Sequence, residues 1–64
     1  MAARICKGMY VEIGKAHMMG KGLRPDEYTG CEGEVLETDA THALLWIRGK
    51  GEVYFVFRRL TPIA

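Results

Sequence analysis

The chain has 64 residues and a net charge of +1 at neutral pH, with 48% hydrophobic and 27% charged residues. Since domains usually take about 100 to 200 residues, this length predicts a single domain, residues 1–64. The charge balance excludes a polybasic nucleic-acid arm and an acidic tail, and the apolar content excludes a disordered chain.

The first predicted strand covers residues 9–13. Its residues alternate with the period of two that is typical of a strand, and this places on one face Met9, Val11 and Ile13. A glycine-rich stretch, residues 14–30, follows, and we expect it to form a long loop. Its adjacent methionines, Met18 and Met19, are expected to pack onto the body of the domain.

The second predicted strand begins where this loop ends. Gly30 and Gly33 are expected to bend the chain at its entry, and the strand itself is expected to continue to Glu37.

The strongest local signal is a β-hairpin over residues 42–58. Two apolar runs flank Gly49-Lys50-Gly51, and a three-residue turn there lets Gly49 or Gly51 take a positive φ. The register that this turn predicts has the facing pairs Arg48 with Glu52, Ile47 with Val53, Trp46 with Tyr54, and His42 with Arg58.

Both faces of this hairpin are apolar. The face expected to point into the core consists of Ala43, Leu45, Ile47, Val53, Phe55 and Phe57. The opposite face carries the predicted interface residues Leu44, Trp46, Tyr54 and Val56, which Tyr10 or Leu36 could extend. Since a large aromatic side chain buries about 150 to 250 Å², this face approaches the size of an interaction site. Three arrangements stay open: the long loop covers this face, another protein chain covers it, or it is simply exposed to solvent.

Residues 58–64 are expected to form one helical turn and a short last strand, which Pro62 confines to a sheet edge. No segment shows the pattern of an amphipathic helix. The sequence therefore predicts an all-β domain, a small, strongly bent barrel of five short strands with a long loop after the first.

This pattern resembles the SH3-like barrels, particularly their KOW-type members. The matching segments are residues 7–13, 28–35 and 57–63. In these families a Gly-x-x-Gly-x-Val turn, matched by Gly30, Gly33 and Val35, opens the second strand, and an aromatic-x-x-Leu ending closes the barrel. The resemblance implies a five-stranded SH3-like barrel. It implies no single activity, because the fold serves ribosomal and transcription-factor KOW modules, small photosynthetic subunits and type II dihydrofolate reductases.

Charge is unevenly distributed along the chain. Residues 26–39 hold six acids and no base, whereas the remainder holds nine bases against Glu12 and Glu52. The side chains that could contact phosphates are Lys15, Lys21, Arg24, Lys50, Arg58 and Arg59. An exposed base could stack on Trp46 or Tyr54. The alternative is an ordinary solvated charge pattern.

No motif points to catalysis, a cofactor or a metal. The chain has no serine, and no nucleophile stands in a recognisable pattern with a base. The spacing of zinc chelates is absent among the soft ligands Cys6, His17, Cys31 and His42. We expect a non-enzymatic protein without a bound metal.

No stretch approaches the length of about 18 apolar residues that spans a bilayer, and no secretory signal is visible. We expect a cytoplasmic protein that avoids membranes and keeps both thiols reduced. Its expected function is that of a non-catalytic binding module, which docks on a protein partner or on another copy through the outer hairpin face. Two alternatives stay open: a KOW-like module that binds RNA or DNA, and a small oligomeric enzyme with a site between subunits.

Overall fold

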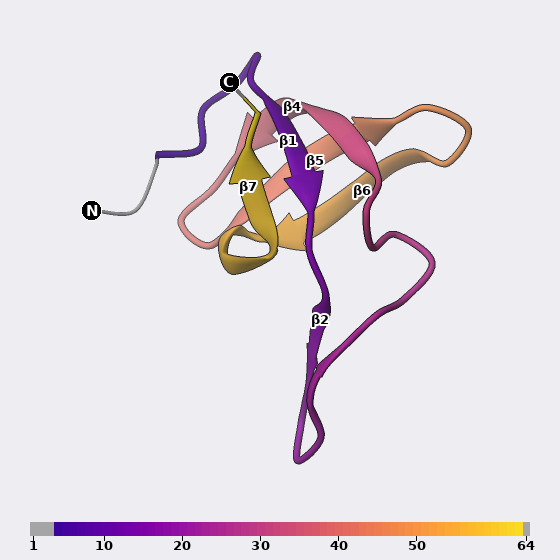
Figure 1. Ribbon diagram of the computed structural model, residues 1–64. Coiled ribbons are helices and arrows are strands. Elements are labelled where there is room, and N and C mark those ends of the chain that lie inside the picture. The colour runs from indigo at the N-terminus through magenta and orange to yellow at the C-terminus, as the bar shows by residue number, and fades with distance from the viewer. Residues whose placement is uncertain (1–3, 64) are drawn as a thin grey trace.

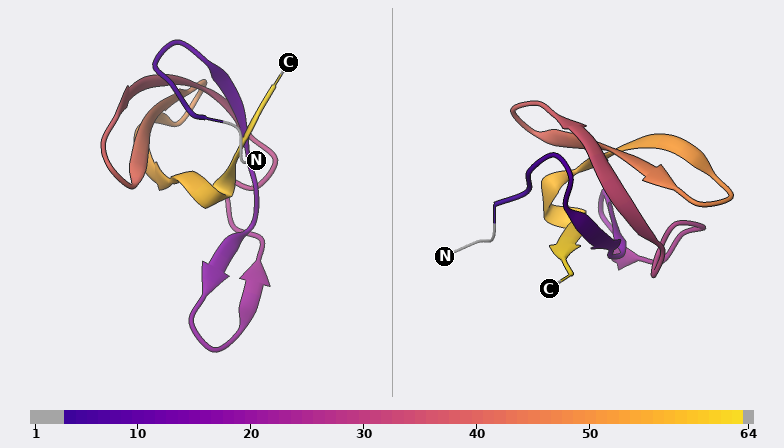
Figure 2. Two further views of the ribbon diagram at one scale, coloured as in Figure 1. Left: turned by 90° about the vertical axis from the view of Figure 1, so that its left-hand side faces the viewer. Right: turned by 90° about the horizontal axis from the view of Figure 1, so that it is seen from above.

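The computed structural model describes residues 4–63, and strands dominate this part of the chain. An antiparallel five-stranded sheet forms the body, in the spatial order β6-β5-β4-β1-β7 (Figure 1). Its strands are β1 (Tyr10–Ile13), β4 (Glu32–Thr38), β5 (His42–Ile47), β6 (Gly51–Val56) and β7 (Leu60–Pro62). The sheet is strongly curved (Figure 2). The predicted all-β class is confirmed, and the five predicted strands correspond to this sheet. The predicted closed barrel is not shown, because β6 and β7 lie at opposite edges of the sheet and do not pair with each other.

The predicted long loop contains a hairpin of its own. Strands β2 (Ala16–Met18) and β3 (Gly22–Arg24) form a separate two-stranded sheet that projects away from the body (Figure 2). We call residues 15–24 the arm. At its tip the Lys21 N–H donates to the Met18 carbonyl at 2.9 Å, so a tight turn closes the ribbon.

The expectation that the arm's methionines pack onto the body is wrong. Met18 is 45% exposed and Met19 96% exposed. Gly20 and Gly22 have positive φ values of 74° and 72°, which let the chain reverse direction at the tip of the arm. The arm therefore presents apolar side chains to the outside.

One core fills the concave side of the sheet. Its buried members are Val11, Ile13, Val35, Ala43, Leu45, Ile47, Phe55 and Leu60. The predicted inward face of the β5–β6 hairpin is correct in its four buried residues, while Val53 and Phe57 are half-buried at the margin of the core.

The predicted register of this hairpin is wrong by two positions. Trp46 faces Glu52 and Tyr54 faces Leu44, so the two aromatic side chains are diagonal neighbours. The turn lies one residue earlier than predicted, at residues 48–50, because Gly49 and Gly51 both hold a positive φ and the pairing resumes at Gly51. A slip of two positions preserves the alternation, so each side chain keeps its predicted face.

Gly33 lies inside β4 and does not bend the chain as predicted. A Cβ atom there would stand 3.0 Å from the Trp46 carbonyl oxygen and 3.2 Å from Ile47 Cγ1. Glycine is favoured at this position because β4 and β5 approach closely and a Cβ atom would crowd the backbone of β5. Gly30 has a φ of 87°, as expected for the bend that precedes the strand.

The C-terminal prediction is confirmed. A single 3-10 turn, η1 (Phe57–Arg59), leads into β7, which pairs with β1 and lies at an edge of the sheet. Pro62 is tolerated there because an edge strand leaves one row of backbone groups without a strand partner.

Candidate interaction face

The five-stranded sheet has a side turned away from the core, which we call the outer face. Its side chains include those of Tyr10, Glu12, Glu32, Glu34, Leu44, Trp46, Glu52, Tyr54, Val56 and Ile63. Trp46 is 46% exposed and Tyr54 60% exposed, whereas Leu44 and Val56 are half-buried. The four predicted interface residues thus share one side of the sheet, and residues 14–30 leave its aromatic side chains open.

A cross-strand row runs over this face. Tyr10 faces Glu34, which faces Trp46 across the next pair of strands. Trp46 in turn faces Glu52. The Ile63 N–H donates to the Tyr10 carbonyl at 2.9 Å and so continues the row beyond β1. The strand pairing therefore extends the predicted patch to Tyr10. It also adds Ile63, which the sequence did not suggest.

Carboxylates surround these apolar side chains. Glu12 and Glu32 face each other across β1 and β4, and both are exposed. One base, Arg48, lines a groove on this face together with Trp46 and Glu32. The outer face combines aromatic side chains with negative charge, a setting that suits a cationic and partly apolar partner.

The arm has the opposite character. It holds Lys15, Lys21 and Arg24 and no acid. Its Leu23 is 63% exposed and stands opposite His17 in the two-stranded ribbon. Three of the six predicted phosphate-contacting residues therefore lie on the arm, beside exposed apolar side chains.

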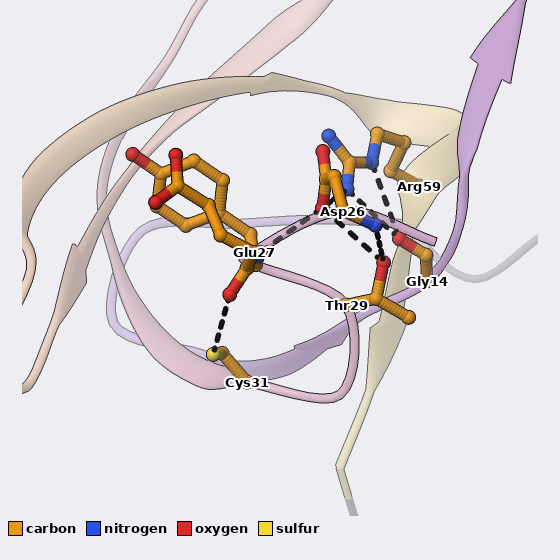
Figure 3. Close-up of polar contacts among 7 residues, drawn as sticks. Gly14, Asp26, Glu27, Thr29, Cys31 and Arg59 are labelled. Carbon is orange, nitrogen blue, oxygen red and sulfur yellow. Dashed lines mark hydrogen bonds and ion pairs between the residues drawn. The ribbon is translucent and has the colours of Figure 1, made fainter. Parts of the chain in front are cut away.

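Arg59 fixes the base of the arm (Figure 3). Its guanidinium donates to the Gly14 carbonyl at 3.2 and 3.0 Å and to Asp26 Oδ1 at 2.9 Å. Gly14 returns a backbone hydrogen bond to the Arg59 carbonyl at 2.6 Å. Gly14 precedes the arm and Asp26 follows it, so the Arg59 side chain holds both ends of the arm.

Burial alone would raise the pKa of the Asp26 carboxyl, but its hydrogen bonds act in the opposite direction. The Arg59 guanidinium is the strongest of these influences, followed by the Tyr28 N–H, and together they hold the pKa below its ordinary value of 3.8. Thr29 adds a hydroxyl donor at 3.2 Å. Asp26 is therefore charged at neutral pH and anchors the return of the arm to the sheet.

Aromatic and cationic side chains tie this base to the core. The Tyr28 ring meets Phe55 edge-on, with 5.2 Å between centroids, and the Arg59 guanidinium lies 5.0 Å from the Phe55 centroid. Lys50 Nζ lies 5.5 Å from the Tyr28 centroid. Lys50 and Arg59 were predicted as phosphate contacts, and both have intramolecular partners here.

Arg58 was also predicted as a phosphate contact, and it lies apart from the arm. It is exposed on η1 and lines a groove together with Arg4, Ile5, Asp39 and Phe57. Sequence reasoning missed this groove, because its two arginines lie near opposite ends of the chain and only the fold brings them together.

The described residues offer no assembled catalytic group. Thr41 Oγ1 lies 2.7 Å from His42 Nδ1, but Asp39 accepts hydrogen bonds from the backbone N–H groups of both residues and not from the imidazole. These bonds lower the pKa of Asp39, with the Thr41 N–H as the main cause. The cluster stabilises the turn between β4 and β5.

Within residues 4–63, no three metal-binding side chains converge, and Cys6 and Cys31 are free thiols. No helix in that range has the length and apolar content needed to cross a membrane.

Comparisons with known proteins add no identity. No family model matches the chain, and neither a curated protein nor a solved structure shows significant similarity to it. The outer face and the arm are the features of this chain that bear on its function.

Proposed function

We propose that this chain is a non-catalytic, SH3-like binding module that acts by protein contact through its outer face, most simply by self-association. The observation that carries the proposal is the exposed row of Tyr10 and Trp46, joined diagonally by Tyr54. The core already occupies the other side of the sheet, so these side chains gain burial only from another molecule.

Three further features fit this assignment. The chain has one strand, a long segment that contains the arm, a three-strand meander, a 3-10 turn and a last strand beside the first. This order resembles that of the SH3-like barrels. A domain of this size buries only about 60% of its unfolded surface, so a partner adds substantially to its stability. The free thiols of Cys6 and Cys31 fit a reducing compartment such as the cytoplasm.

The test is the Trp46→Ala variant. Aromatic side chains at the centre of an interface dominate its energetics, so this change should convert an oligomer to a monomer or release a partner. It should cost the isolated fold less than Phe55→Ala does. Light scattering and chemical unfolding measure the two effects, and Lys7→Ala, an exposed change in the turn before β1, is the control.

A chain that is monomeric at all concentrations, binds no protein, and has a fully buried indole by Trp46 fluorescence would contradict the proposal.

The second candidate is a KOW-like nucleic-acid-binding module, which the basic arm favours. Here single-stranded RNA or DNA would bind at low salt, and alanine at Lys21 and Arg24 would lower the salt slope by about one unit for each lost phosphate contact. A protein contact centred on Trp46 would not show that steep dependence.

A further inference from the structure

The exposed large apolar side chains among residues 4–63 divide into two groups. One group lies on the outer face and consists of Tyr10, Trp46, Tyr54 and Ile63. The other lies on the arm and consists of Met18, Met19 and Leu23. A single chain therefore carries two apolar surfaces, and each is of the kind that marks contact with another molecule.

These two surfaces carry opposite charge. The arm has three bases and no acid, whereas carboxylates border the apolar row of the outer face. Glu12 and Glu32 face each other directly, and like charges at facing positions destabilise a sheet. A cationic partner lying on the outer face would relieve that repulsion.

The arm does not cover the outer face of its own chain. Its tip residue Met19 is 96% exposed, and Trp46 keeps 46% of its surface open. The arm projects away from the sheet (Figure 2), and the bonds of Arg59 to Gly14 and Asp26 hold its base in that direction. A two-stranded ribbon is only marginally stable by itself in water, so contact with another molecule would stabilise the arm.

We infer that the arm of one copy lies on the outer face of a second copy, whose own arm lies on the outer face of the first. The inference rests on the proposed function, because it names the occupant of the same face. Reciprocal exchange gives a closed two-fold assembly and buries both apolar surfaces of both chains. A stable interface takes about 800 Å² from each partner, and each chain contributes twice, with its arm and with its face.

The side chains of the two surfaces are chemically matched. Methionine thioethers such as that of Met19 adapt to irregular surfaces and make favourable contacts with aromatic rings such as Trp46. The cationic groups of Lys21 and Arg24 complement the carboxylates, with Glu32 and Glu52 both exposed on the outer face. Complementary charge of this kind favours an arm on a face over two like-charged faces against each other.

A charge exchange tests the inference. The arm variant carries Lys21→Glu with Arg24→Glu, and the face variant carries Glu32→Lys with Glu52→Lys. Each variant alone should associate about 30-fold or more weakly than the wild type, as expected for the loss of an interface hot spot. An equimolar mixture should restore association, since the acidic arm then meets a basic face and the unchanged arm meets an unchanged face.

Sedimentation velocity measures this association. The matched control is Arg4→Glu with Lys7→Glu, a double charge reversal at exposed positions outside both surfaces, and it should associate like the wild type.

An intermolecular spin label tests the placement directly. A Cys6→Ser, Cys31→Ser, Met19→Cys chain, whose only thiol is at position 19, is spin-labelled there and mixed with an unlabelled ¹⁵N chain. The label should broaden the Trp46 indole N–H signal of the ¹⁵N chain and leave its Lys7 amide signal sharp.

The possible failures are distinguishable. If Trp46→Ala dissociates the assembly while the arm variant associates like the wild type, the proposed function stands and the arm exchange is wrong. A wild-type chain that stays monomeric at every concentration overturns the exchange. So does a monomer that binds single-stranded oligonucleotide through Lys21 and Arg24, which would assign the arm to phosphate binding.

Discussion

The two hairpins of this protein have the same local topology and different surroundings. In β5–β6, Leu45 is fully buried and Phe55 nearly so, and β5 pairs with β4 on its other side. In β2–β3, each strand has three residues, and Leu23 stays 63% exposed. One hairpin is held by burial and by neighbouring strands. The other is held by its own turn and by the contacts at its base.

This difference separates stability from association. A hairpin that contributes to the core determines whether the chain folds, because burial of apolar surface is the dominant favourable term in folding. A hairpin that projects with its apolar side chains exposed contributes little to the isolated fold. We therefore expect substitutions in β5–β6 to change the free energy of unfolding, and substitutions in the arm to change self-association.

The largest expected effect on stability comes from a substitution in the buried hairpin β5–β6. Phe55→Ala should lower the free energy of unfolding by about 3 to 5 kcal/mol, because a large cavity remains. Leu23→Ala, the corresponding truncation in the arm, should cost less than about 0.5 kcal/mol, as exposed substitutions usually do. Urea unfolding at a chain concentration low enough to keep each protein monomeric compares the two variants, because association would otherwise add to the measured stability. Equal costs would show that the arm contributes to stability as the core does, and would contradict the difference between the two hairpins.

The junction between the two regions should give an intermediate effect. Arg59→Gln removes charge-assisted bonds to Gly14 and Asp26 and should lower the free energy of unfolding by about 1 to 3 kcal/mol. Arg58→Gln, at the exposed neighbouring position, is the matched control and should be close to neutral.

Hydrogen exchange localises the effect of this change. The Gly30 N–H bonds to the Ile13 carbonyl at 2.8 Å, next to the contact of Arg59 with Gly14. This N–H should exchange faster in Arg59→Gln than in Arg58→Gln. Equal exchange in the two variants would show that Arg59 does not hold the base of the arm.

The smallest effect is a pH dependence at the same junction. The pKa of Asp26 is lower in the folded chain than its ordinary value of 3.8, so the folded state binds this proton less readily than the unfolded state does. Its contribution is complete above that ordinary value and is lost as the pH falls through the lowered pKa of the folded state. The stability difference between wild type and Asp26→Asn should therefore be constant near neutral pH and shrink in acid.

Unfolding curves of both proteins across this range measure the difference. A difference that grows in acid would contradict the assigned direction of the shift.

Alternation explains how far the sequence predicted the fold. Strands with one buried side, such as Tyr10–Ile13, repeat apolar residues with period two and were found. The arm was missed because the side chains of Gly22–Arg24 are exposed on both sides, so no burial imposes a pattern on them. The register of β5–β6 was missed for another reason: Gly49 and Gly51 both allow a positive φ, and the sequence alone does not decide where the turn lies.

The sequence predicted the part of the candidate site that lies within one hairpin, but not the parts that depend on contacts between distant segments. Trp46 and Tyr54 were found because one hairpin carries two apolar faces and the fold has one core. The addition of Ile63 to the same row depends on β7 lying beside β1, which no short segment reveals. The role of Arg59 depends on a contact with Gly14 across 45 residues of chain.

The bonds of Arg59 to Gly14 and Asp26 also make the arm a suitable place to insert a foreign peptide. Arg59 binds both Gly14 and Asp26, so the distance between these two residues is fixed by Arg59. The number of residues that connect Gly14 to Asp26 is therefore not determined by the sheet. Each doubling of a flexible loop costs only about 0.6 kcal/mol in closure entropy. Foreign peptides could thus be displayed between Met19 and Gly20, with the body of the domain serving as a scaffold of constant structure.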